Sequence, residues 1–428
     1  MTGNLTGVGI IILVMLAHLA FGVPLFVVLG LGALAIILIY DVYSLAAFGD
    51  TPFSSIDSWA LLAMPLFILA GEIISRGKTA RHLVNLAEAI VGWMKGGLGM
   101  ATIFGCFLFA GTSGSSSADT ITIGKIMVPP MRQQGYLGSY AASLAASGGI
   151  LGVIVPPSLI FIIYGVTTST SIGGLFLGGI LPGLVMAIAM CCANYFVCRY
   201  SSWGSVEHSN FHLRKLARAF WDAKYGIGAP VIILGGIYTG VFTPTEAAAV
   251  AIGYVTIVEF LIHKSIGLKD LGQSLGAAAI ATGMLAPIIA FSILFGETLA
   301  ILHVPTELIN TFMAIDAGYV GSVTIIVLIL LIVGFVLEPI AAVLVVMPIL
   351  APIGVQLGFD PVHFGVFAVC TLGVGFITPP VGINLFAASA VSGEQFIEIA
   401  WRAIPAFIGL LVAISIIAAF SGLTLWYK

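Results

Sequence analysis

Apolar runs of about 20 residues alternate with short polar pieces along the whole chain. A helix needs roughly 20 apolar residues to cross about 30 Å of hydrocarbon. In the first half, the runs therefore predict membrane-crossing helices over residues 5–21, 24–43, 57–75, 137–170 and 173–198. An amphipathic stretch over residues 78–95 and a further segment over residues 96–133 lie between the third and fourth of these helices.

The segment over residues 96–133 has a polar centre, Gly111-Thr112-Ser113-Gly114-Ser115-Ser116-Ser117, which cannot continue a lipid-facing helix. Irregular backbone at membrane depth is tolerated only where protein or a cavity covers it, because an unpaired polar group in lipid costs several kcal/mol. We therefore expect this segment to form a re-entrant hairpin with the polar centre at its tip.

The glycines and prolines of the first half recur in the second half. Gly152-Val153-Ile154-Val155-Pro156-Pro157 matches Gly375-Phe376-Ile377-Thr378-Pro379-Pro380, and Gly111 matches Gly334 at the same shift. The sequence therefore predicts two tandem repeats, 1–203 and 222–428, with hairpins over 96–133 and 321–356 and broken helices over 137–170 and 361–391. Each repeat crosses the membrane about five times. Because this number is odd, the second repeat starts on the opposite side of the membrane and has the inverted orientation. Inverted repeats with interrupted helices are typical of secondary transporters.

The basic residues support this topology. On it, all Lys and Arg residues except Lys125 and Lys428 lie on one side, which the positive-inside rule makes the cytoplasm. The opposite loops over 41–57 and 167–173 carry no Lys or Arg, so we expect both termini on the outer side. Residues 204–221 are expected to form an amphipathic linker helix that contacts lipids at the cytoplasmic membrane surface, with a solvated linker as the alternative.

Composition agrees with a membrane protein, because 60% of the 428 residues are apolar and only 8% are charged. The net charge of −3 and the scattered basic residues argue against nucleic-acid binding. No nucleophile elbow, metal-binding His pair or P-loop is present, so we expect neither an enzyme nor an ATP-driven motor. The five cysteines lie in apolar segments and suit packing, and no cofactor is expected. An ion gradient would then supply the energy for transport.

Four interruptions at depth are the candidate chemical sites: the tips 111–117 and 334–339, and the breaks 147–158 and 371–381. Each break contains Pro-Pro, which removes two backbone donors and frees carbonyl oxygens upstream. Carbonyl and hydroxyl oxygens suit a hard cation such as Na+, whereas helix N-termini suit an anion. We expect two cation sites with an anion site between them, although helix kinks for packing are the alternative.

Two carboxylates accompany the tips. Asp119 follows the serine run near membrane depth, where it would orient the tip or add charge near a cation, or else pair with Lys125. Glu338, in the second tip, suits helix capping about as well as an ion role. Glu246 follows Thr243-Pro244-Thr245, and this pattern predicts an ordinary N-terminal helix cap.

The tip 111–120 (GTSGSSSADT), Pro129-Pro130 and the break from Ser147 to Ser158 resemble the large membrane subunit of tripartite ATP-independent periplasmic (TRAP) transporters, of the DctM or SiaM type. The resemblance covers essentially the full length. It implies an all-α, elevator-type fold of the ion-transporter superfamily in a bacterial inner membrane, driven by Na+. It also implies a small four-helix membrane subunit, expected as a separate chain, and a periplasmic binding protein that delivers an organic anion such as a C4-dicarboxylate or sialic acid. A self-sufficient Na+/dicarboxylate symporter of the same superfamily is the alternative.

The resemblance also assigns residues to sites. The first Na+ site would use Gly111, Thr112, Ser113, Ser115, Gly152, Val155 and Ser158. The second would use Gly334, Gly375, Thr378 and Val381. Substrate contact or gating would fall to Ser116, Asp119, Pro156, Pro157, Glu338, Pro379 and Pro380. The second tip carries no hydroxyl group, so the two sites are not expected to be equivalent.

Overall fold

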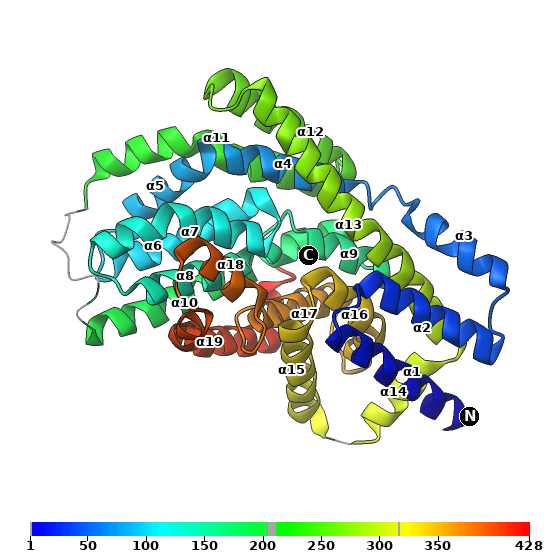
Figure 1. Cartoon of the computed structure of the whole chain (residues 1–428). Coiled ribbons are helices and arrows are strands. Elements are labelled where there is room, and N and C mark those ends of the chain that lie inside the picture. Colours follow the sequence, from blue (N-terminus) through cyan, green and yellow to red (C-terminus); the bar gives the residue numbers. More distant parts are fainter. Residues whose placement is uncertain (1, 202, 204–210, 316) are drawn as a thin grey trace.

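A computed structural model describes residues 2–201, 203, 211–315 and 317–428, and this part of the chain is helical without strands (Figure 1). The first half contains α1 (Thr2–Ala20), α2 (Leu25–Tyr40), α3 (Leu45–Ile56), α4 (Ala63–Arg76), α5 (Thr79–Val91), α6 (Gly97–Ser113), α7 (Ser116–Gln133), α8 (Gly138–Gly149), the 3-10 helix η1 (Ile150–Val153), α9 (Leu159–Thr168) and α10 (Ile172–Tyr200).

The second half contains α11 (Leu213–Tyr238), α12 (Pro244–Thr256), the π-helix η2 (Ile257–Ile262), α13 (Leu268–Ile301), α14 (Val304–Met313), α15 (Gly318–Val336), α16 (Pro339–Gln356), α17 (Pro361–Gly375), α18 (Ile383–Ser392), α19 (Phe396–Ala419) and η3 (Ser421–Leu423).

The elements follow the same order in both halves. A short arm helix (α5 or α14) precedes a helical hairpin (α6–α7 or α15–α16), then a broken helix (α8–η1–α9 or α17–α18), then a long helix (α10 or α19). The fold is therefore all-α and repeated, with the hairpins and interrupted helices expected from the glycine and proline pattern.

Two segments differ in detail from the sequence-based expectations. The loop expected over residues 41–57 contains α3, which packs against α13; the rings of Phe48 and Phe291 lie 6.0 Å apart. The expected linker helix over 204–221 falls partly outside the described residues, and residues 213–221 are the first turns of α11 rather than a separate helix. Packing against α13 stabilises α3. Residues 213–221 join α11 because no glycine or proline interrupts the chain between residues 213 and 225.

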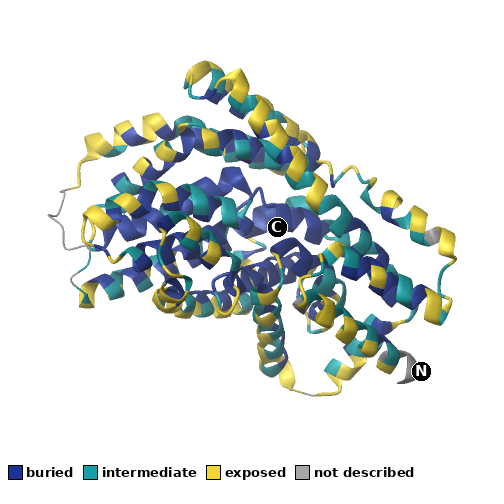
Figure 2. Ribbon diagram, viewed as in Figure 1, coloured by how far each residue is buried: buried dark blue, intermediate teal, exposed yellow. Residues whose placement is uncertain are grey.

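Six described helices are long and apolar enough, by length and composition, to cross a membrane: α10, α12 with η2, α13, α15, α16 and α19. α1, α2 and α3 lie together at one end of the molecule beside α13 (Figure 1). Figure 2 shows that the centre, which includes α8, α9 and α17, is buried. The hairpin α6–α7 packs against α8 and η1, and α16 packs against α9 and α17. Each hairpin therefore reaches the centre of the molecule next to a helix break.

Candidate functional site

The first hairpin turns at Gly114 and Ser115, between the end of α6 and the start of α7. Gly114 has a φ of 65°, a left-handed conformation that glycine adopts without steric cost. Ser115 is extended, and its backbone N–H donates to Ser113 Oγ at 3.3 Å. Thr112 Oγ1 donates to the carbonyl of Phe109 at 2.7 Å. The tip is thus a tight turn in which the Thr112 and Ser113 hydroxyl groups each bond to a backbone group of the hairpin itself.

The first tip lies directly against the break that follows α8. A methyl group built on Gly152 would lie 2.6 Å from both Ser115 O and Asp119 Oδ2. Similarly, a methyl group on Gly114 would lie 2.9 Å from Pro157 O. Only glycine at these positions leaves room for the two backbones to approach so closely. The structure therefore brings the tip and the break, predicted to form one site, into contact.

The other residues expected at the first site lie in the same region. Gly111 lies between α11 and the break, since a methyl group there would lie 3.3 Å from Pro230 Cβ and 3.7 Å from Pro156 O. Ser158 is buried, begins α9 as its N-cap, and donates from Oγ to Val153 O at 2.6 Å. Val155 is buried in the break between them. Carbonyl and hydroxyl oxygens, the ligands that Na+ prefers, are concentrated here.

Asp119 is fully buried beside this contact. One carboxylate oxygen, Oδ1, accepts a hydrogen bond from Ser113 Oγ. The other, Oδ2, is buried without a hydrogen-bond partner among the described residues and lies next to Gly152. Lys125 is exposed and forms no ion pair in the described part of the chain, so the pairing alternative does not apply. A buried carboxyl group without a partner on one oxygen either binds a proton or lies beside a positive charge, and a cation between tip and break would supply that charge.

The second tip meets its break by backbone contact. A methyl group on Gly375 would lie 2.7 Å from Gly334 Cα, and one on Gly334 would lie 2.6 Å from Leu372 O. Thr378 donates from Oγ1 to Val374 O at 3.0 Å. The predicted juxtaposition of the second tip and break is therefore present, but Thr378 is its only nearby hydroxyl among the residues we assigned to that site.

The break at the second site is less buried than the break at the first. Glu338 caps α16, accepting from Ile340 N at 3.1 Å and Ala341 N at 3.2 Å, so its capping role is present in the structure. Pro379, Pro380 and Val381 are exposed, whereas residues 151–160 in the first break are all buried. The Pro-Pro bonds are cis in both breaks.

Asn384 connects the two halves and was not identified from the sequence. It is fully buried near the start of α18, where Oδ1 accepts from Ser116 Oγ at 2.8 Å and Nδ2 donates to Ala146 O at 3.0 Å. The sequence signal was available, because Asn384 is an amide side chain four residues beyond Pro379-Pro380 in an apolar segment. The side chain holds the start of α7 against the second broken helix.

Both tips face one cavity of about 1160 Å³. Ser113, Ser115 and Ser117 line it from the first hairpin, and Glu338 lines it from the second. The lining also includes basic side chains on the side predicted to be cytoplasmic, Arg76, Lys78 and Arg81, together with Lys125. The space thus connects the two tips with a predominantly basic surface.

One face of α7 runs along this cavity. Ser117, Ile121 and Lys125 are spaced four residues apart, so they lie on the same side of the helix and all line the space. At 1.5 Å per residue, Lys125 lies about 12 Å along the helix from Ser117. Arg81 on α5 and Lys125 are exposed, and neither has an ion-pair partner among the described residues. The free cation Lys125 therefore lies about 12 Å along α7 from Ser117, and a second free cation, Arg81, lines the same cavity.

Comparison with known proteins matches residues 12–423 to the family described as "Tripartite ATP-independent periplasmic transporter, DctM component". The chain is 37% identical to the isethionate TRAP transporter permease protein DctMQ of Oleidesulfovibrio alaskensis, over 94% of this chain and 63% of that relative's length. It is 33% identical to the C4-dicarboxylate TRAP transporter large permease protein DctM of Vibrio cholerae, over 96% and 95% of the two chains. Its fold resembles the YdaH transporter of Alcanivorax borkumensis, with a TM-score of 0.59, 13% identity, and 89% and 88% of the two chains covered.

Proposed function

The chain belongs to the DctM family of tripartite ATP-independent periplasmic transporters, and we propose that it is the large membrane subunit of a Na+-coupled importer of an organic anion. One observation carries the proposal: each hairpin tip meets a helix break, and both tips border a single cavity. Isethionate and C4-dicarboxylates are named for two relatives, and both are anions. A carboxylate such as a C4-dicarboxylate or sialic acid is the substrate class that we propose.

Coupling to Na+ is proposed to occur first at the contact of Ser115 with Gly152. The unpaired Oδ2 of Asp119 supplies negative charge there, and the tip and break supply carbonyl and hydroxyl oxygens. A bound cation would hold the tip against the break, because oxygen atoms of both would coordinate it. The Gly334–Gly375 contact is the proposed second site, with Thr378 as its hydroxyl ligand.

The anion is proposed to bind between the tips. The start of α7 carries the positive end of a helix dipole, and its first turn borders the cavity. On release, the anion would move along α7 toward Lys125 and Arg81, which attract negative charge at the exposed end. The cavity reaches the side that we predict to be cytoplasmic, so this arrangement suits the inward-facing state of an elevator in which the hairpins and broken helices move together.

Two partners complete the proposed system. A periplasmic binding protein would deliver the anion, and a small four-helix membrane subunit would enlarge the part that stays fixed in the membrane. A bacterial inner-membrane location with both termini on the periplasmic side is part of the same proposal.

Uptake into proteoliposomes tests the proposal. The chain and its small subunit would be reconstituted, and labelled C4-dicarboxylate, sialic acid and isethionate supplied with or without a Na+ gradient and a binding protein. The site variant Ser113→Ala is expected to abolish accumulation, and Ser415→Ala, at an exposed position on α19, serves as the matched control. Accumulation that needs both Na+ and the binding protein supports the proposal. Accumulation with Na+ alone favours the self-sufficient symporter, and uptake indifferent to Na+ refutes the coupling.

A further inference from the structure

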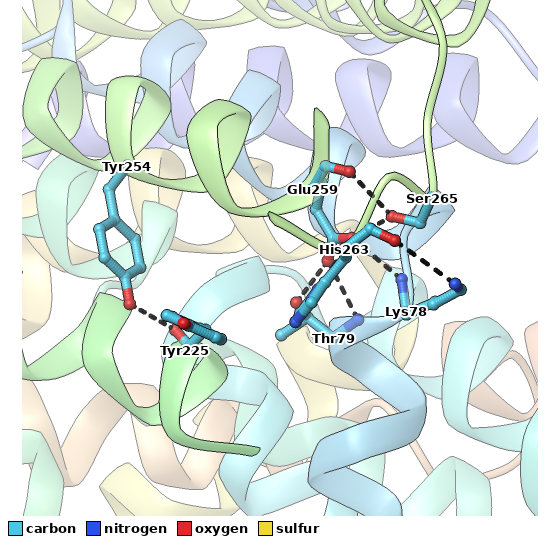
Figure 3. Close-up of polar contacts among 7 residues, drawn as sticks. All are labelled: Lys78, Thr79, Tyr225, Tyr254, Glu259, His263 and Ser265. Carbon is cyan, nitrogen blue, oxygen red and sulfur yellow. Dashed lines mark hydrogen bonds and ion pairs between the residues drawn. The ribbon is translucent and has the colours of Figure 1, made fainter. Parts of the chain in front are cut away.

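Glu259 is a fully buried carboxylate at the C-terminal end of α12, within the π-helix η2 (Figure 3). It accepts hydrogen bonds from the backbone N–H groups of Lys78, at 3.1 Å, and Thr79, at 3.0 Å. The hydroxyl groups of Thr79 and Ser265 also donate to it. A carboxylate on one helix therefore caps the first turn of another helix, the arm α5, where free N–H groups and the helix dipole favour negative charge.

The local backbone is shaped to admit this carboxylate. A methyl group built on Gly77 would lie 2.1 Å from Glu259 Cδ, so any larger residue would displace the side chain. π-Helical turns such as η2 are rare and frequently occur at functional positions. Gly77, just before α5, and the π-helix η2 therefore both allow the Glu259 side chain to reach the start of α5.

Aromatic and imidazole rings surround the contact. His263 Nδ1 lies 3.3 Å from Glu259 Oε2, and the His82 ring stacks on His263 with centroids 5.1 Å apart. The ring of Tyr225, on α11, meets His263 edge-on at 5.6 Å. Lys78 Nζ donates to His263 O at 3.4 Å. Three helices, α5, α11 and α12 with η2, therefore converge at the start of the arm.

The second arm has no such anchor. α14 begins with Val304 and Pro305, and no side chain caps its first turn among the described residues. Glu307 lies in that first turn, but its carboxylate forms no hydrogen bond or ion pair there. The two arms occupy equivalent places in the repeat, so a cap on the first arm alone is a specific property of that arm.

We propose that Glu259 is a positioning residue for transport, which fixes the first turn of α5 as the pivot about which the hairpin α6–α7 moves. The proposal rests on the proposed elevator function. α5 leads through residues 92–96 directly into α6 and packs along it, so any displacement of the hairpin must be taken up by α5. A fixed first turn confines that movement to one arc, and a released first turn lets the arm slide as well as rotate.

Glu259→Gln tests the anchor, because the amide is close in shape but has one acceptor oxygen and no charge. Hydrogen exchange of the backbone amides of Lys78 and Thr79 is measured in the purified complex, and we expect it to quicken about tenfold or more. Glu307→Gln, in the matching turn of the second arm, is expected to leave this exchange unchanged. Unchanged exchange in Glu259→Gln would refute the anchor, whether or not the protein transports.

The same variants are then compared in proteoliposome uptake. Glu259→Gln should lower the maximal rate about fivefold or more, while the KM for the anion and the Na+ dependence stay within about twofold, because the binding sites are untouched. Faster exchange with an unaltered maximal rate would refute the positioning role. Absence of Na+-dependent uptake by the unmutated complex would instead refute the proposed function, and the exchange result would still decide whether Glu259 anchors the arm.

Discussion

Replacing Gly152 by alanine perturbs the proposed first Na+ site at one atom. The added methyl carbon would lie 2.6 Å from Ser115 O and from Asp119 Oδ2, about 0.8 Å inside the 3.4 Å at which ordinary contact begins. Gly152 belongs to η1, a right-handed 3-10 helix, so alanine is compatible with its backbone conformation. The expected effect is therefore steric, and the tip must move away from the break.

The size of the effect follows from overpacking. Extra methyl groups in tightly packed sites cost about 1–3 kcal/mol. If that cost falls on the Na+-bound state, the Na+ concentration for half-maximal uptake rises about tenfold at 1.4 kcal/mol and roughly a hundredfold at twice that. A shift of the ligand oxygens by nearly 1 Å has consequences of the same order in other sites.

The assay is Na+ titration of anion uptake in proteoliposomes, with thermal unfolding in detergent to verify folding. Gly124→Ala is the matched control: Gly124 is a buried glycine of α7 whose added methyl would lie 3.5 Å from its neighbours, an ordinary contact. The control should keep the Na+ dependence of the unmutated protein and gain slight helix stability. A folded Gly152→Ala protein with unaltered Na+ dependence would refute the assignment of Na+ to this contact.

Three further predictions concern buried or partly buried polar groups. Asp119→Asn keeps a partner for Ser113 but removes the charge, so the half-saturating Na+ concentration in uptake should rise at least about tenfold. Asn384→Ala leaves Ser116 without its partner and should lower the free energy of unfolding by about 1–3 kcal/mol, measured in detergent. Burial, and then the adjacent imidazole of the stacked pair, lower the pKa of His82. Its neutral form is therefore favoured in the fold, so melting temperature should fall as pH drops below about 6.5, and His82→Gln should reduce that fall.

The sequence predicted correctly those elements whose ends coincide with glycine, proline or serine residues. Glycine, proline and serine interrupt apolar runs at the hairpin tips and breaks, so α6, α7, α15 and α16 begin and end close to the expected residues. The cap at Glu246 was predicted as well: its Oε2 accepts from Thr243 N at 2.8 Å, within a capping box. Each tip meets its own break, but through different residues: Gly334 meets Gly375 in the second repeat, whereas Ser115 meets Gly152 in the first.

The contacts that the sequence could not predict join residues far apart in the chain. Asn384 lies 268 residues from Ser116, and Glu259 lies 180 residues from Thr79. A single polar residue in an apolar run shows that a partner is needed, but periodicity does not identify the partner. α3 was missed for a different reason, because its 12 residues include Pro52 and make too short an apolar run to stand out.

The two tips also differ in a way that bears on coupling. At the first, a buried carboxyl group whose Oδ2 has no hydrogen-bond partner among the described residues lies beside the break, where it could contact a bound cation directly. At the second, Glu338 already satisfies its helix terminus, and the break is exposed from Pro379 to Val381. The first tip therefore offers a bound cation a carboxyl group, whereas the second offers backbone oxygens and the Thr378 hydroxyl. On the proposed mechanism, Na+ binding at the first tip then contributes most of the free energy that couples the ion to movement of the hairpin. Binding at the second site contributes the smaller part.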